Sequence, residues 1–219
     1  MNKLILGFLL LAVAASFTMA QTSSDFKKTE YYVGYSNGQV DNGSNTGNSI
    51  GSFFKDRANF NGFEASGVYN ISRYFGVKAD FSGTYRQDNV SSTFSSGGVP
   101  TTLSATRNSS LYNLLGGVQI KDNASDSRFK PFAHALVGWG HGRATISNVT
   151  CTPTAVCTTN NYANQTLTDN GLAGAFGGGL DVKLNDKFDF RVVQVDYNPV
   201  KFGGRTDNNI RLGVGLVIK

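Results

Sequence analysis

The chain has 219 residues, of which 16% are charged, 12% are aromatic and 26 are glycine. Few charges combined with many glycines and aromatics suit long β-strands better than a helical domain. The formal net charge of +5 is mild, and Lys and Arg do not cluster along one face, which argues against a nucleic-acid partner.

The first 20 residues have the features of a secretory signal peptide. Lys3 precedes an almost wholly apolar run, Leu4 to Ala15, and Ala20 stands before a polar stretch. The run is shorter than the ~20 residues that a membrane-spanning helix needs, and no later stretch is long enough, so any membrane crossing must use strands. We expect three parts: a signal peptide at 1–20, a short periplasmic leader at 21–29 and a β-barrel at 30–219.

Eight segments of the remaining chain alternate apolar and polar side chains with the period of two that is typical of β-strands. These predicted strands are 30–36, 60–70, 75–86, 109–121, 128–143, 172–183, 188–198 and 209–219. Their connections alternate in length, with short turns at 71–74, 122–127 and 184–187 and long loops at 37–59, 87–108, 144–171 and 198–208. This pattern predicts an all-β fold, an eight-stranded antiparallel up-and-down transmembrane barrel with short periplasmic turns and long external loops.

The last predicted strand shows why the sheet is expected to close. Its apolar face consists of Ile210, Leu212, Val214, Leu216 and Ile218. A strand of this length rises roughly 36 Å, or about 27 Å when tilted near 40°, which matches the apolar band of an outer-membrane barrel. An open edge in lipid would leave amide groups without partners, so we expect this strand to pair with the first one.

Aromatic residues stand near the ends of the predicted apolar faces, as in the girdles that bracket the hydrocarbon layer around membrane barrels. The predicted interfacial aromatics are Tyr31, Tyr35, Phe75, Tyr85, Tyr112, Trp139, Phe188 and Tyr197.

The segment 188–198 changes phase, because the polar residues before Val192 and those after Val193 differ in parity. We predict a β-bulge at Val192 and Val193, which would return all the polar residues to one face. The residues concerned are Asp189, Arg191, Gln194 and Asp196.

The face opposite the apolar one carries ionisable side chains among many glycines. The predicted interior polar network is Glu64, Lys78, Asp80, Arg86, His134, Asp181, Arg191, Asp196 and Arg211. A small barrel has just enough interior for side chains, so opposing charges can pair there. A soluble lipocalin also has eight alternating strands, with its apolar face turned inward. The charged second face and the bracketing aromatics favour the membrane barrel.

The chain resembles the small outer-membrane β-barrel family that includes the barrel half of OmpA-like proteins. The resemblance lies in residues 75–86, 130–138, 177–182, 191–197 and 210–218. It implies an outer-membrane location among outer-membrane lipid, assembly by the barrel insertion machinery and a plugged or very narrow interior. The chain departs from the family pattern in ending with Lys219, where such barrels usually end in an aromatic residue. We also expect no peptidoglycan-binding domain after the barrel.

Cys151 and Cys157 lie close together in the longest predicted loop of a chain sent to an oxidising compartment. A disulfide is therefore the leading interpretation, since metal binding by this pair lacks further nearby ligands. His134 and His141 have opposite strand phases and cannot jointly bind one ion without bending of the strand. Neither histidine belongs to a His-x-Ser pair that could supply a base and a nucleophile. We expect no catalytic residue, no metal and no cofactor.

The sequence thus predicts a non-enzymatic outer-membrane barrel with a structural or surface-interaction role. An unidentified external ligand is expected to contact loops 37–59, 87–108 and 144–171. The alternative is a narrow channel for ions or small solutes, with Arg191 and Arg211 as candidate gating residues. A lipid-modifying enzyme and a soluble lipocalin-like binder are less favoured.

Overall fold

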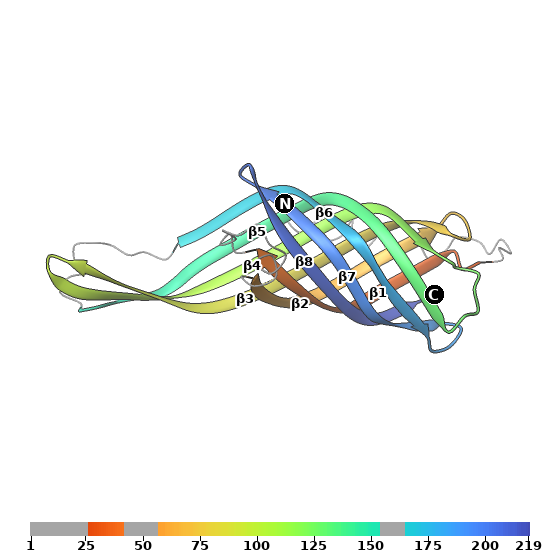
Figure 1. Ribbon diagram of the computed structural model, residues 1–219, viewed down its shortest axis with the longest axis horizontal. Coiled ribbons are helices and arrows are strands. Elements are labelled where there is room, and N and C mark those ends of the chain that lie inside the picture. The colour runs from red at the N-terminus through yellow and green to blue at the C-terminus, as the bar shows by residue number, and fades with distance from the viewer. Residues whose placement is uncertain (1–25, 42–56, 154–164) are drawn as a thin grey trace, which may run out of the picture.

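The computed structural model describes residues 26–41, 57–153 and 165–219, within which eight strands form one closed barrel (Figure 1). The strands are β1 (Thr29–Asp41), β2 (Arg57–Asn70), β3 (Phe75–Ser96), β4 (Val99–Lys121), β5 (Phe129–Thr152), β6 (Gln165–Lys183), β7 (Phe188–Phe202) and β8 (Arg205–Ile218). Each strand pairs antiparallel with the next in sequence, which confirms the predicted up-and-down order. The predicted signal peptide and part of the predicted leader lie outside the described residues.

The sheet closes through β1 and β8, whose register runs from Tyr31 opposite Ile218 to Gln39 opposite Ile210. The prediction that the last strand pairs with the first is therefore confirmed. Closure leaves no open edge along the membrane-facing part of the sheet, as a barrel in lipid requires. No helix among the described residues is long and apolar enough to cross a membrane.

Short turns join the strands at one end of the barrel, and those at 71–74 and 184–187 have the predicted bounds. Arg73 in one turn reaches Asp122 in the next at 2.9 Å, and the hydrogen bonds from the Arg73 guanidinium lower the pKa of Asp122. Lys219 lies at the same end, where its backbone amide donates to the carbonyl of Lys187. In outer-membrane barrels this end faces the periplasm.

The other end differs from the prediction, because most of the segments predicted as long loops are strand. The loop predicted at 87–108 is a hairpin that turns at Gly97 and Gly98, whose φ angles of 58° and 83° suit glycine. In Figure 1, β3, β4 and β5 run on beyond the other strands at this end. The loop predicted at 198–208 is likewise a hairpin, turning at Gly203 and Gly204.

The physical reason for this difference is the β propensity of threonine. Rows of Ser and Thr such as those in 87–108 are common in loops, but Thr is a good strand former and can pair across strands. Thr93 and Thr102 face each other with their hydroxyl oxygens 3.1 Å apart. Strand β5 extends to Thr152 and β6 begins at Gln165, so the loop predicted at 144–171 is also partly strand; residues 154–164 lie outside the described residues, as do 42–56 of the loop predicted at 37–59.

The predicted β-bulge at Val192 and Val193 is present. Arg191 and Gln194 on β7 pair with Gly215 and Gly213 on β8, so three steps along β7 match two along β8. The two valines are 40% and 43% exposed, both on the outer surface, while the polar side chains on either side are buried. The bulge therefore keeps the inward face of β7 polar along its whole membrane-spanning length.

The outward face of the barrel is apolar and the inward face is largely polar. In the membrane-spanning part of β3, for example, the large exposed side chains are Phe75, Val77, Phe81 and Tyr85. Lys78 and Asp80, which alternate with them, are 1% exposed. This orientation corrects the soluble-barrel alternative, in which the apolar face would point inward.

Candidate functional site

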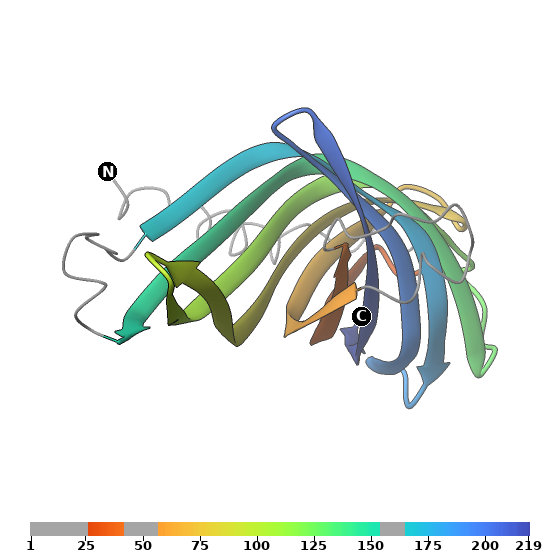
Figure 2. The same cartoon turned by 60° about the vertical axis from the view of Figure 1, so that its left-hand side comes forward.

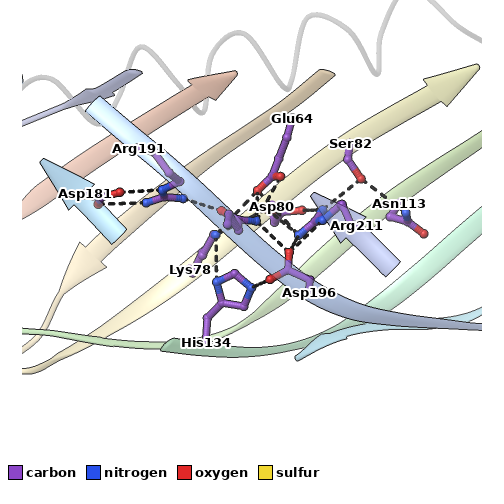
Figure 3. Close-up of polar contacts among 11 residues, drawn as sticks. Glu64, Lys78, Asp80, Ser82, Asn113, His134, Asp181, Arg191, Asp196 and Arg211 are labelled. Atoms are coloured by element: carbon purple, nitrogen blue, oxygen red, sulfur yellow. Dashed lines mark hydrogen bonds and ion pairs between the residues drawn. The ribbon is translucent and has the colours of Figure 1, made fainter. Parts of the chain in front are cut away.

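The interior of the barrel holds a network of charged side chains from six strands, β2, β3, β5, β6, β7 and β8 (Figure 3). All of them point inward because they occupy alternate positions that share one strand face. The buried members predicted from the sequence are Glu64, Lys78, Asp80, His134, Asp181, Arg191, Asp196 and Arg211.

Arg211 on β8 forms the first centre of this network. Its Nη1 donates to Asp80 Oδ1 at 2.7 Å, and its Nη2 donates to Asp196 Oδ2 at 2.8 Å. Glu64 Oε1 lies 3.7 Å from Nη2. Three carboxylates from three different strands thus surround one guanidinium, whose fixed fork of donors suits such bridging.

Arg191 on β7 forms the second centre. Its Nε and Nη2 donate to the two carboxylate oxygens of Asp181 at 2.8 and 3.2 Å. The guanidinium also stacks over the rings of Phe132 and Tyr32, at 3.9 and 4.3 Å from their centroids. The bidentate ion pair and the two ring contacts together hold this arginine in a single geometry.

Gln194 joins the two centres. Its side-chain carbonyl accepts from Arg191 Nη1 at 2.7 Å, and its amide nitrogen donates to both Glu64 and Asp196 at 2.8 Å. The sequence placed Gln194 on the polar face but not in the predicted network. It can lie between the centres only because the bulge at Val192 and Val193 turns it inward.

Lys78 and His134 form the remaining part of the network. Lys78 Nζ lies 3.3 Å from His134 Nδ1 and 3.6 Å from the carboxylate of Asp80. His134 Nε2 in turn lies 2.8 Å from Asp196 Oδ1. The histidine therefore bridges a lysine and a carboxylate inside the barrel.

Ion pairs continue from the network to the periplasmic end. Lys121 Nζ lies within 3.1 Å of the carboxylates of both Glu30 and Asp181. Lys219 Nζ lies 2.6 Å from Asp189. The Lys219 side chain therefore takes part in an inward ion pair at the periplasmic end of the barrel.

Positive and negative groups balance inside the barrel. Among the described residues, the buried carboxylates are Glu30, Glu64, Asp80, Asp181, Asp189 and Asp196, and the buried cations are Lys78, Lys121, Lys130, Arg191, Arg211 and the side chain of Lys219. Six negative groups therefore face six positive ones. An interior this narrow is expected to neutralise its charges by pairing, since an unpaired buried charge is costly.

An apolar layer lies between the charged network and the outer mouth. Its buried members are Leu111, Leu115, Leu136, Ala173, Ala175 and Val200, with Val40 and Phe202 packed against them. On β5 the layer begins at Leu136, the next inward-facing position after His134 toward the outer mouth. On β7 it begins at Val200, two inward-facing positions beyond Asp196 in the same direction. The alternation of side chains does not predict this layer, because its residues share the strand face that carries the charges.

Arg86 does not belong to the interior network, which corrects its predicted place. It lies where β3 leaves the barrel, and its Nε donates to Asp88 at 2.6 Å. Arg107 on β4 reaches the same carboxylate at 3.1 Å. This separate cluster sits above the membrane-spanning part of the sheet.

The histidines and the cysteines form no shared site among the described residues. His134 points inward and His141 outward, where its ring stacks on Trp139 at a centroid distance of 5.6 Å. No group of three or more His, Cys, Asp or Glu side chains in the described part of the chain could hold a metal ion. Cys151 lies near the end of β5, while Cys157 lies outside the described residues, so their disulfide stays a prediction.

None of the predicted interfacial aromatics is buried, and all of them lie on the outward face. Those toward the outer end are Tyr35, Tyr85, Tyr112, Trp139 and Tyr197, and those toward the periplasmic end are Tyr31, Phe75 and Phe188. The two groups flank the apolar band at the positions expected of interfacial girdles.

A closed barrel with an apolar outer band, aromatic residues at both ends of that band and a polar interior defines a transmembrane β-barrel of the bacterial outer membrane. Residues 8–217 match the family described as the outer membrane protein beta-barrel domain, and the chain belongs to this family.

Two solved structures of another outer-membrane protein show the same fold. This chain is similar to Ail, the attachment invasion locus protein of Yersinia pestis, in a structure of Ail in complex with the heparin analogue sucrose octasulfate. The TM-score is 0.52 and the identity 18%, over 87% of this chain and 97% of Ail. A second Ail structure gives a TM-score of 0.51 and 17% identity over the same shares. Neisserial surface protein A has a TM-score of 0.45 and 13% identity over 91% of this chain and 99% of its own. No curated protein matches the sequence.

Proposed function

We propose that this protein is a non-enzymatic, non-conducting barrel that holds a rigid β-sheet outside the cell as a recognition surface. The observation that carries the proposal is the continuation of β3, β4 and β5 beyond the barrel. We call this part the outer sheet and define it as residues 87–96, 99–108 and 144–152. Figure 2 shows the long strands curving away from the barrel.

The outer sheet is regular enough to act as a fixed surface. β3 and β4 stay paired without interruption from Phe75–Ile120 to Ser96–Val99. Cross-strand contacts such as Ser91–Ser104 and Thr93–Thr102 join side chains along it. A paired sheet loses less conformational entropy on binding than a flexible loop would, which favours recognition.

The outer sheet also has an open edge among the described residues. β2 pairs with β3 only as far as Tyr85, opposite Asn61. The backbone of residues 87–96 therefore has no strand partner on that side in the described part of the chain. Such an edge can accept an extended segment of another protein by strand addition.

The comparison with Ail supports a surface role, because Ail is named for attachment and was solved with a heparin analogue. The conducting alternative is opposed by the geometry of the interior. The charged groups are paired with one another, and an apolar layer that includes Leu136 and Val200 lies across the path to the outer mouth. Hydrophobic constrictions exclude water and ions.

Removal of the outer sheet tests the proposal. A variant in which an Asn-Gly turn replaces Val90–Ala105 should keep the barrel, because it joins the paired residues Asn89 and Thr106. We expect bacteria that display this variant to lose attachment to cultured cells and to heparin-coated surfaces. The matched control replaces only Gly97 and Gly98 by Asn-Gly and should attach like the parent.

The amount of folded barrel in each strain is measured from the shift in gel mobility on heating. Equal attachment by the shortened variant and the parent, at equal amounts of folded barrel, would refute recognition by the outer sheet. Loss of attachment in the turn control as well would show that the effect does not depend on the deleted strands.

A further inference from the structure

A cavity of about 580 Å³ lies on the outward face of β3, β4 and β5, outside the barrel. Its lining includes Tyr85 and Gln87 from β3, Asn108 and Tyr112 from β4, and His141 and Arg143 from β5. It is separate from the interior network and lies at the base of the outer sheet, with which it shares Gln87 and Asn108. Its volume falls within the range of pockets that bind small molecules.

The cavity lies at the height of the lipid headgroups. Along β3 the outward side chains are apolar or aromatic from Phe75 to Tyr85 and become polar at Gln87. Ten residues rise about 34 Å along a strand, or about 26 Å at a tilt near 40°, which is the height of the apolar band. The same change occurs between Tyr112 and Ser110 on β4. The cavity therefore begins at the outer end of the apolar band.

Arg143 provides an unpaired positive charge in this cavity. It is exposed, and among the described residues no hydrogen bond or ion pair engages its guanidinium. No carboxylate belongs to the cavity lining. The nearby Asp88 is already occupied by Arg86 and Arg107. A free guanidinium without a carboxylate partner suits the planar, bidentate binding of a phosphate.

The rest of the lining suits a sugar ring. The Tyr85 and Tyr112 rings meet edge to face at a centroid distance of 5.6 Å, and the His141 ring lies 6.4 Å from that of Tyr112. His141 is held by Asn170, whose Oδ1 lies 2.7 Å from its Nδ1. Aromatic rings at the membrane boundary offer an apolar surface with polar edges.

Amide side chains stand beside these rings. Gln87 and Asn108 face each other across β3 and β4. Each carries both donors and acceptors, and so matches the hydroxyl groups of a sugar.

We propose that this cavity binds the phosphorylated sugar headgroup of a lipid in the outer leaflet. Arg143 pairs with the phosphate, the rings of Tyr85, Tyr112 and His141 form the wall against the sugar, and the amides bind its hydroxyl groups. The bound lipid would fix the barrel in the membrane just below the outer sheet.

Trp139, the only tryptophan in the chain, provides the readout because it stacks on His141 at the cavity wall. Diphosphoryl lipid A is titrated into the purified barrel in detergent micelles while the Trp139 emission is recorded. We expect a saturable change with diphosphoryl lipid A and none with the same lipid after removal of its phosphates. Arg143→Gln should weaken the binding of diphosphoryl lipid A by about tenfold.

The matched control is Arg128→Gln, which removes an exposed arginine at the periplasmic end. It should bind diphosphoryl lipid A like the parent. Equal weakening by both substitutions, or equal binding of the dephosphorylated lipid, would overturn the phosphate site. Saturable binding of glucosamine 1-phosphate with the same affinity would overturn the assignment to a lipid, because a soluble sugar phosphate would then suffice.

Discussion

Arg211 is the residue on which the interior network depends most. Its guanidinium bridges Asp80 on β3 and Asp196 on β7, and all three side chains are buried. Replacement by Met would leave buried carboxylates without their main cation. We therefore predict that Arg211→Met lowers the free energy of unfolding by about 3–5 kcal/mol. Urea unfolding of the barrel in lipid vesicles, followed by Trp139 emission, measures this loss.

Arg205→Met is the control for Arg211→Met. Arg205 pairs with Asp207 at 3.0 Å, but its side chain is 58% exposed. Surface pairs of this kind contribute about 1 kcal/mol or less. If both substitutions cost the same free energy, burial would not be what makes the Arg211 bridge important.

The sequence identified most charges of the central network, but it identified neither their partners nor the buried charges nearer the periplasmic end, such as Glu30. Parity alone placed Glu64, Asp80 and Arg211 on one face, since polar positions alternate with apolar ones along each strand. Arg211 pairs with Asp80, 131 positions earlier in the chain, because the barrel closes and its strands are staggered. That stagger depends on the register of every strand pair, which side-chain alternation does not determine. Arg86 had the correct parity but lies beyond the closed part of the barrel.

At the scale of the element, the bulge in β7 determines which side chains face lipid. Without the extra residue at Val192 and Val193, every side chain after that point would change face, and Gln194 and Asp196 would point into the hydrocarbon. We predict that deletion of Val193 prevents formation of a heat-modifiable barrel after refolding.

Val193→Ala is the matched control for this deletion. It keeps the number of residues and changes only an outward side chain, so it should refold like the parent. A deletion variant that refolds with parental yield and stability would show that the register shift can be absorbed elsewhere in β7.

The bulge could be predicted from the sequence, whereas the lengths of β3, β4 and β5 could not. A phase change between Arg191 and Gln194 is visible in the order of polar and apolar residues alone. Beyond the membrane both faces of a strand are polar, so the alternation vanishes although the backbone pairing continues. Rows of Ser and Thr between Gln87 and Asn108 therefore gave no sign of the hairpin that they form.

The predicted disulfide between Cys151 and Cys157 belongs to the same scale, because it would act on one connection and not on the barrel. We expect both thiols to resist alkylation until a reductant is added. Cys151→Ser should leave the barrel heat-modifiable, since closing so short a loop contributes only about 2 kcal/mol. Alkylation of both cysteines in the unreduced, folded protein would contradict the pairing.

At the scale of the whole molecule, the interior has two layers with different consequences for passage through the barrel. The periplasmic part contains paired charges, and the outer part contains the apolar layer of Leu111, Leu136 and Val200. Water that enters from the periplasmic end would meet groups already bonded to one another and then a layer made mainly of apolar side chains. The apolar layer, and not the arginines, is therefore the expected barrier to ions.

Planar-bilayer recordings of the refolded protein test this assignment. We predict that the parent shows no discrete conductance steps and that the combined variant Leu111→Ser, Leu136→Ser and Val200→Ser produces them, because polar, smaller side chains would let water cross the layer. The control variant Val33→Ser, Val77→Ser and Val137→Ser places the same change on the lipid face and should remain silent if it inserts. Steps in the parent that disappear in Arg211→Ala would instead make the charged network the conducting path, and the barrel would then be a narrow channel.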